Sequence, residues 1–115
     1  MKENLKTIGA KIKLKKGSLT EVRAWALELN QRIDEAMETL KDEGVYLETV
    51  FLDRAIDADY LVYFMKVVDV KKAGKIAQKS KHAIDAFHQQ FKKNCWVANH
   101  PLELLIDLDR YEELN

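Results

Sequence analysis

The sequence predicts an α+β fold in which strands and helices follow one another in the order β, α, β, β, α, β. Three observations support this order: an alternating strand pattern near the start, a long amphipathic helix after it, and a hairpin at residues 45–68 that is apolar on both faces. This order is the split βαβ, or ferredoxin-like, plan, in which a four-stranded antiparallel sheet carries two helices on one face.

The first strand and the first helix are predicted from periodicity. Apolar side chains alternate with small or basic ones from Thr7 to Leu14, which is typical of a strand with one buried face. Ser18 and Glu21 form an S-x-x-E pattern, which predicts a capping box at the start of a helix. Gly44 is a typical C-cap, so one helix of about 25 residues, roughly 37 Å long, is predicted between Ser18 and Gly44. Its apolar stripe consists of Leu19, Val22, Ala26, Leu29, Ile33, Ala36, Met37 and Leu40.

The hairpin consists of two largely apolar runs joined by the polar turn Arg54 to Asp59. Both alternating sets of its side chains are mostly apolar. Since a strand points successive side chains to opposite faces, both faces of the sheet must be covered. The turn length leaves the register open, so the sequence does not determine which row faces the helices.

Three further elements are predicted after the hairpin. Asp69 predicts an N-cap for a short helix, Val70 to Lys79, and a second helix runs from about His82 to Trp96. Pro101 then opens the last strand, Leu102 to Asp109, because proline is tolerated at the first position of a strand. The final YEELN is expected to fray.

Two helices can cover only one face of this sheet. The other face keeps small and basic side chains from the first strand, one apolar row from the hairpin, and Leu105 between acidic residues from the last strand. An apolar area of several hundred Å² with charged margins is typical of an interface between two copies of a chain. We therefore predict a homodimer that packs sheet face against sheet face.

The composition narrows the classes of function. A chain of 115 residues is expected to form one domain, 1–115. Nineteen basic and nineteen acidic residues cancel, so neither nucleic acid nor an anionic membrane is an expected partner. Cys95 is the only cysteine and cannot form an internal disulfide. With no apolar leader and no run long enough to span a bilayer, the expected location is the cytoplasm.

The segments VYLETVFLDR, HAIDAFHQQF and PLELLIDLD resemble an uncharacterised bacterial family of short domains of unknown function. The likeness covers roughly Ile8 to Arg110. The whole layout resembles the dimeric α+β barrel superfamily, which includes antibiotic-biosynthesis-type monooxygenases, muconolactone isomerases and rhamnose mutarotases. The resemblance implies a cleft between sheet and helices for a small organic ligand. It implies no catalytic residue, because no motif of the superfamily matches this chain residue by residue.

His88 is the first candidate for chemistry, because it lies on the inward stripe of the last helix and should point toward the sheet. The same stripe contains Ile84, Phe87, Phe91 and Cys95. Asp85, one turn earlier, is positioned to hold a ring nitrogen and fix the tautomer, as carboxylates do for catalytic imidazoles. The alternative is a core histidine that is hydrogen-bonded to a main-chain carbonyl or to Glu48.

His82, Asp85 and His88 follow at three-residue steps, and these residue types are suitable ligands for a divalent metal. The two histidines lie about 120° apart around a helix, with a rise of about 9 Å between their Cα atoms. A metal would need a further ligand such as Glu48, so we predict no metal site. His82 remains a candidate ligand-binding residue.

Glu48, Tyr63 and Trp96 complete the candidates. A carboxylate within an apolar strand is costly unless paired, so Glu48 is either a general base in a pocket or, the favoured alternative, one half of an ion pair across the sheet or the dimer interface. Its candidate partners are Lys11, Lys13 and Lys66. Tyr63 would donate a hydrogen bond to a ligand, and the ring of Trp96 would pack against that ligand. Such aromatic residues more often belong to the hydrophobic core. On a helical wheel Asp85, Lys92 and Trp96 fall along one flank.

The leading hypothesis is a homodimeric barrel domain that binds a small organic molecule in a cleft lined by His88, Glu48, Tyr63 and Trp96. Proton transfer by His88, oriented by Asp85, is the predicted chemistry, as in an isomerase or a cofactor-free oxygenase, and no cofactor is predicted. The sequence has no glycine-rich phosphate loop, C-x-x-C motif or Ser-His-Asp arrangement. The alternatives are a non-catalytic dimerisation or interaction module, and a ligand sensor.

Overall fold

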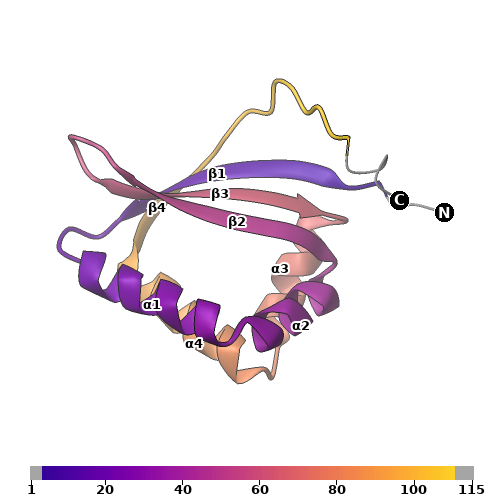
Figure 1. The fold of residues 1–115 in the computed structure, drawn as a ribbon, viewed down its shortest axis with the longest axis horizontal. Coiled ribbons are helices and arrows are strands. Elements are labelled where there is room, and N and C mark those ends of the chain that lie inside the picture. Colours follow the sequence, from indigo (N-terminus) through magenta and orange to yellow (C-terminus); the bar gives the residue numbers. More distant parts are fainter. Residues whose placement is uncertain (1–3, 111–115) are drawn as a thin grey trace.

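The computed structural model describes residues 4–110 and consists of a four-stranded antiparallel sheet with helices against one face (Figure 1). The elements are β1 (Lys6–Leu14), α1 (Leu19–Gln31), α2 (Ile33–Glu43), β2 (Val45–Arg54), β3 (Asp59–Val67), α3 (Val70–Lys79), α4 (Ala83–Cys95) and β4 (Trp96–Pro101). The strand order is β2-β3-β1-β4. The predicted ferredoxin-like plan is confirmed.

The register of the hairpin decides which side chains face the helices. β2 and β3 pair with Val50 opposite Tyr63 and Leu52 opposite Leu61. Because Leu61 and Tyr63 are buried beneath the helices, Glu48, two residues from Val50, shares their face. The opposite, open face carries Thr49, Phe51, Val62, Phe64 and Lys66 of this hairpin.

The hydrophobic core has two parts between the sheet and the helices. The larger part gathers side chains from β1, β3, α1 and α4: Ile12, Leu14, Val22, Trp25, Leu61, Tyr63, Phe91 and Cys95. The smaller part lies under α3 and consists of Val45, Val67 and Ala73. Full burial of one large apolar side chain stabilises a fold by roughly 1.5–3 kcal/mol, so these clusters hold the helical layer on the sheet.

The predicted single helix between Ser18 and Gly44 is wrong, because the chain breaks at Arg32 into α1 and α2. Arg32 has φ −113° and ψ 41°, and its amide is shared between the carbonyls of Glu28 and Leu29. Its guanidinium pairs with Glu28 and Glu35 on either side of the break. After this turn Ile33 and Met37, predicted to face the core, are 56% and 58% exposed.

The cap predictions have mixed outcomes. Gly44 ends α2 in the left-handed conformation with φ 71°, and the Asp69 side chain accepts a hydrogen bond from the amide of Lys72 at the start of α3. Both caps are confirmed. Ser18 is the N-cap of α1, but its hydroxyl donates to the carbonyl of Lys15, and the Glu21 carboxylate accepts from Sγ of Cys95. The predicted capping box is therefore wrong.

The last strand is also misplaced in the prediction. The chain passes directly from α4 into β4, so residues 96–101 occupy the free edge of β1, with Pro101 opposite Ala10. Proline lacks the N–H that would continue the ladder. Residues 102–109 form no strand and arch over the open face (Figure 1). There the carboxylate of Asp107 accepts a hydrogen bond from the hydroxyl of Thr7 and forms an ion pair with Lys66. The predicted fraying of YEELN falls outside the described residues.

No helix within residues 4–110 has the length and apolar character needed to cross a membrane.

Candidate functional site

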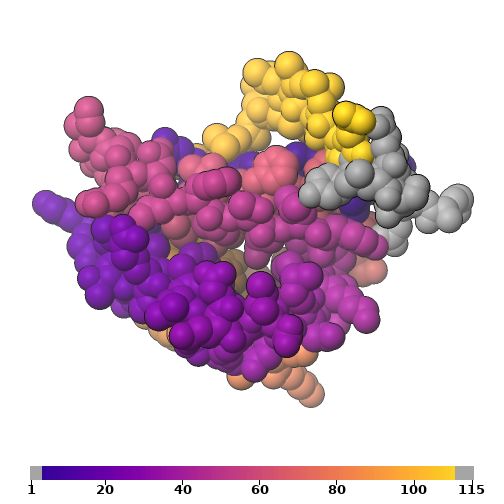
Figure 2. Space-filling view, in the orientation of Figure 1, coloured from indigo at the N-terminus to yellow at the C-terminus, as the bar shows by residue number. Residues whose placement is uncertain are grey.

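Polar and ionisable side chains gather between the sheet and α4. Asp85, His88 and Lys92 follow at steps of three and four along one face of α4, so they point the same way. Glu48 approaches from the helix-facing side of β2. The space-filling view has an opening between α1, α2 and the edge strand β2, with atoms of α4 at its back (Figure 2). We name the region behind this opening the interior cleft and assign to it six neighbouring side chains: Glu48, Tyr63, Asp85, His88, Lys92 and Trp96. Their charges and rings lie close enough to interact with one another.

Carboxylates outnumber cations around the interior cleft. Although Glu48 is exposed at the edge strand, the protein around it removes enough water to raise its pKa; Lys92 opposes this rise and Asp85 adds to it. Burial raises the pKa of Glu43, at the end of α2, to about 7, and repulsion from Asp85 and Glu48 contributes. Loss of water lowers the pKa of Lys92, which these carboxylates partly offset. With a pKa of about 7, Glu43 therefore carries only part of its negative charge near neutral pH.

Two hydrogen-bond donors beside this cluster have no partner. The hydroxyl of Tyr63 and Nε1 of Trp96 are inaccessible to solvent and bond to no group within residues 4–110. Their rings meet edge to face with centroids 5.7 Å apart, and Nζ of Lys92 lies 4.8 Å from the centroid of the Trp96 ring. An unpaired buried donor costs about 1–3 kcal/mol, so a molecule with oxygen acceptors would gain by binding here.

His88 is uncharged at neutral pH. The indole Nε1 of Trp25 donates to its Nδ1 across 3.0 Å, and because an indole can only donate, the ring proton of neutral His88 lies on Nε2. Burial, and then the charge of Lys92, lower the pKa of His88 to about 3. The sequence predicted Asp85 as the partner that sets the tautomer, whereas the structure gives this role to Trp25. His88 is therefore suited to donate a hydrogen bond and is a weak base.

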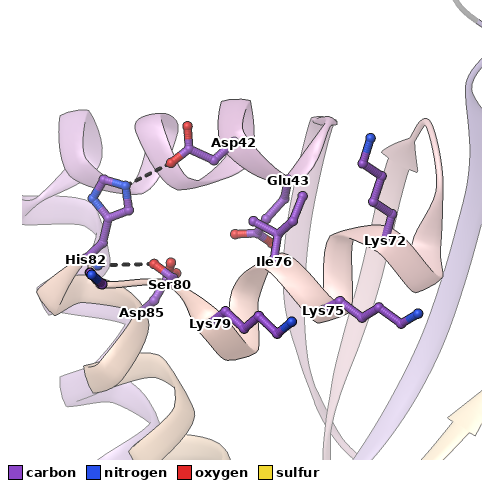
Figure 3. A pocket seen from close by; sticks show the side chains of 10 residues that line it. Asp42, Glu43, Lys72, Lys75, Ile76, Lys79, Ser80, His82 and Asp85 are labelled. Carbon is purple, nitrogen blue, oxygen red and sulfur yellow. Dashed lines mark hydrogen bonds and ion pairs between the residues drawn. The ribbon is translucent and has the colours of Figure 1, made fainter.

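His82 lies apart from the interior cleft. It is the N-cap of α4, and its Nε2 lies 2.9 Å from a carboxylate oxygen of Asp42, a hydrogen bond that raises the pKa of His82. It lines a cavity of about 600 Å³ between α2 and α3, to which Glu43 and Asp85 also belong (Figure 3). Within residues 4–110, no three His, Cys, Asp or Glu side chains are placed to hold a metal ion.

The structure brings the predicted residues together around the interior cleft, except His82. Within residues 4–110 Glu48 has no ion pair across the sheet, because Lys11 pairs with Asp53, Lys66 pairs with Asp107, and Lys13 alternates with the helix-facing residues of β1. A pairing across a dimer interface stays a prediction. Sequence reasoning missed Lys92 and Glu43 as functional residues. The sequence did contain a signal for Lys92, because the helical wheel places it on the same flank of the helix as Asp85 and Trp96. Glu43 had none, because a carboxylate beside a helix C-cap resembles an ordinary solvated residue.

The comparisons with known proteins identify a family and a fold. The model of a family of unknown function, DUF6176, matches residues 5–113. No curated protein matches the chain. Among solved structures, the L-rhamnose mutarotase of Formosa agariphila is similar, with 22% sequence identity, a TM-score of 0.61, and coverage of 90% of this chain and 99% of that one. At this identity the likeness shows the fold, a ferredoxin-like α+β barrel arrangement, and not the activity.

Proposed function

The chain belongs to the family of unknown function DUF6176, and from its site we propose that it binds a small polyhydroxylated molecule in the interior cleft. The observation that carries this proposal is that two hydrogen-bond donors without a partner lie close to carboxylates. Tyr63 and Trp96 need hydrogen-bond acceptors, while the nearby carboxylate of Glu48 accepts from donors. A hydroxyl group is both donor and acceptor, so a molecule with several hydroxyls can bond to all three side chains.

The chemistry that fits these groups is an isomerase-type proton transfer. Glu48 takes the proton of the anomeric hydroxyl while the bond between the anomeric carbon and the ring oxygen breaks, which leaves a carbonyl and an alkoxide. Lys92 stabilises this alkoxide, Tyr63 donates a hydrogen bond to it, and Glu48 returns the proton to it. Ring closure on the opposite face of the carbonyl reverses these transfers and gives the other anomer. The raised pKa of Glu48 makes it a stronger base than an ordinary carboxylate, and Glu43, with a pKa of about 7, holds a proton part of the time near neutral pH.

His88 has a supporting part in this proposal. Its pKa of about 3 makes it a poor base, so we assign proton abstraction to Glu48 and give His88 a hydrogen-bond donor on Nε2. The exchange consumes no oxidant, which is why we favour it over the cofactor-free oxygenase chemistry that the sequence also allowed. The similar fold of an L-rhamnose mutarotase, by its name an isomerase, supports this choice.

We further propose that the chain acts as a single-domain homodimer in the cytoplasm, joined through the open face of the sheet. Phe51 and Phe64 on that face are 62% and 40% exposed. The segment that arches over it adds four aliphatic side chains that are 54–91% exposed: Leu104, Leu105, Ile106 and Leu108. Burying this apolar area against a second copy would contribute about 25 cal/mol per Å².

The test combines binding and turnover with neutral monosaccharides. Exchange spectroscopy by NMR measures the interconversion of their anomers with and without the protein. We expect acceleration by the wild-type protein and a loss of at least about 100-fold in Glu48→Gln, since a positioned general base contributes roughly 10²–10⁴-fold. Tyr60→Phe is the control, because Tyr60 bonds to the exposed Asp57 and faces away from the cleft. Binding without acceleration would indicate a sensor, and absence of both would leave an interaction module.

A further inference from the structure

The cavity between α2 and α3 is distinct from the interior cleft and has a different electrostatic character. Its volume is about 600 Å³, within the range of small-molecule sites. α3 lines it with Lys72, Lys75 and Lys79, which stand at i, i+3 and i+7 and so share one side of that helix, and Lys81 follows in the connection to α4 (Figure 3). One side of this cavity therefore carries four lysine side chains.

The four lysines form no ion pair within residues 4–110, while one nearby carboxylate is paired with a histidine and another is only partly charged. Asp42, across the cavity, is engaged by His82. Burial raises the pKa of Glu43 to about 7, so its negative charge is incomplete near neutral pH. The cavity consequently presents an excess of positive charge toward α3.

A phosphate monoester matches this arrangement better than a carboxylate. It carries close to two negative charges near neutral pH and three acceptor oxygens, so several lysines can contact it at once. The lysines line a concavity rather than a flat surface, and the chain as a whole has no net charge, which argues for a small anion rather than a polyanionic partner.

The cavity also adjoins the interior cleft. Glu43 and Asp85 line the cavity; Asp85 is close enough to raise the pKa values of Glu48 and Lys92, and Glu43 is close enough to raise that of Lys92. We propose that the α2–α3 cavity binds the phosphate group of a phosphorylated polyol, held by Lys72, Lys75 and Lys79, while the hydroxyls of the same molecule reach the interior cleft. The link to the hydroxyls rests on the proposed function; the phosphate site stands on the cavity and its lysines.

Inorganic phosphate tests the anion site by itself. It is titrated into ¹⁵N-labelled protein at low ionic strength, and amide shifts are followed. We expect shifts concentrated at residues 72–85, and about tenfold weaker binding in the double variant Lys75→Gln, Lys79→Gln, as for the loss of a charge-assisted hydrogen bond. Lys71→Gln is the matched control, because Lys71 is on the same helix but does not line the cavity. Absent shifts, shifts elsewhere, or an equal loss in Lys71→Gln would overturn the site.

A second arm separates this inference from the proposed function. Glucose 6-phosphate and glucose are compared in the wild-type protein and in Trp96→Phe. Shifts at both α3 and the interior cleft with glucose 6-phosphate, reduced at the cleft by Trp96→Phe, support the whole arrangement. Shifts at α3 alone leave the phosphate site in place and contradict the polyol proposal. Equal affinity for glucose and glucose 6-phosphate contradicts the phosphate site and leaves the polyol proposal in place.

Discussion

Nε1 of Trp25 in α1 donates a hydrogen bond to Nδ1 of His88 in α4 across 3.0 Å. The Trp25 ring also stacks on Phe91, with centroids 4.3 Å apart and planes inclined by 6°. Together these contacts tie the two helices that cover the larger part of the core. They also fix the orientation and the tautomer of a histidine that borders the interior cleft.

The first prediction concerns the protonation of His88. Nitrogen-15 NMR should show a neutral ring with its proton on Nε2 at every pH above about 5, because burial holds its pKa far below the usual 6.5. Trp25→Phe removes the donor to Nδ1 and should redistribute the two tautomers. His82 is the internal control, since its hydrogen bond to Asp42 raises its pKa and Asp42→Asn should bring that pKa back down.

The same histidine affects stability at acid pH. The unfolded chain binds a proton at His88 below pH 6.5, whereas the folded chain does so only near pH 3. The folded state therefore loses stability as the pH falls through this window, and His88→Gln should flatten that part of the profile. A titration of His88 near pH 6.5 in the folded protein would contradict both expectations.

The second prediction concerns Lys92, whose charge interacts with Glu43, Glu48 and Asp85. The folded pKa values of Glu43 and Glu48 lie above the usual 4.5, so the folded state binds more protons than the unfolded state between pH 4.5 and about 7. Stability therefore falls as the pH rises through this window. Lys92→Met removes the cation, raises both pKa values further and should steepen the fall.

Urea unfolding at pH 5 and pH 8 measures this effect. We expect Lys92→Met to lose about 1–3 kcal/mol more at pH 8 than at pH 5, the cost of leaving charges without a partner in a partly dry site. Lys93→Met is the control, because Lys93 is exposed on the same helix. Parallel stability profiles of the two variants would show that Lys92 does not hold the carboxylates.

The third prediction is that Tyr63→Phe has opposite effects on the stability of the ligand-free protein and on its affinity for a ligand. Its hydroxyl is buried without a partner, so Tyr63→Phe should leave the ligand-free protein equally stable or up to about 1 kcal/mol more stable. The same change should weaken binding of a hydroxylated ligand, because it removes a donor from the interior cleft. Thermal unfolding with and without ligand measures both effects. A large loss of stability without ligand would mean that the hydroxyl already has a partner.

The fourth prediction tests the homodimer. Phe51 is 62% exposed on the open face, so Phe51→Asp should leave the fold of one chain intact and prevent association. Light scattering should give twice the chain mass of 13.4 kDa for the wild-type protein and the mass of one chain for the variant. Ile56→Asp is the control, because Ile56 is fully exposed in the hairpin turn. A wild-type protein that remains a single chain at high micromolar concentration would refute the dimer.

The sequence by itself determined the elements whose signals are local. Alternation in β1, the apolar runs of the hairpin, Gly44 as a C-cap and Asp69 as an N-cap all depend on backbone preferences and on neighbouring residues, and all appear in the structure. Periodicity also placed Asp85 and His88 on α4, because a helical repeat is readable along the chain.

Only the tertiary structure decided how these elements meet. The register that turns Glu48 toward the helices and the contact of Trp25 with His88 join residues far apart in the sequence. The break at Arg32 and the early β4 strand likewise depend on what the chain packs against. The raised pKa of Glu43 comes from loss of water and from charges on other elements. Periodicity along a chain reports which side of an element is apolar, but desolvation and pairing exist only once distant segments are in contact.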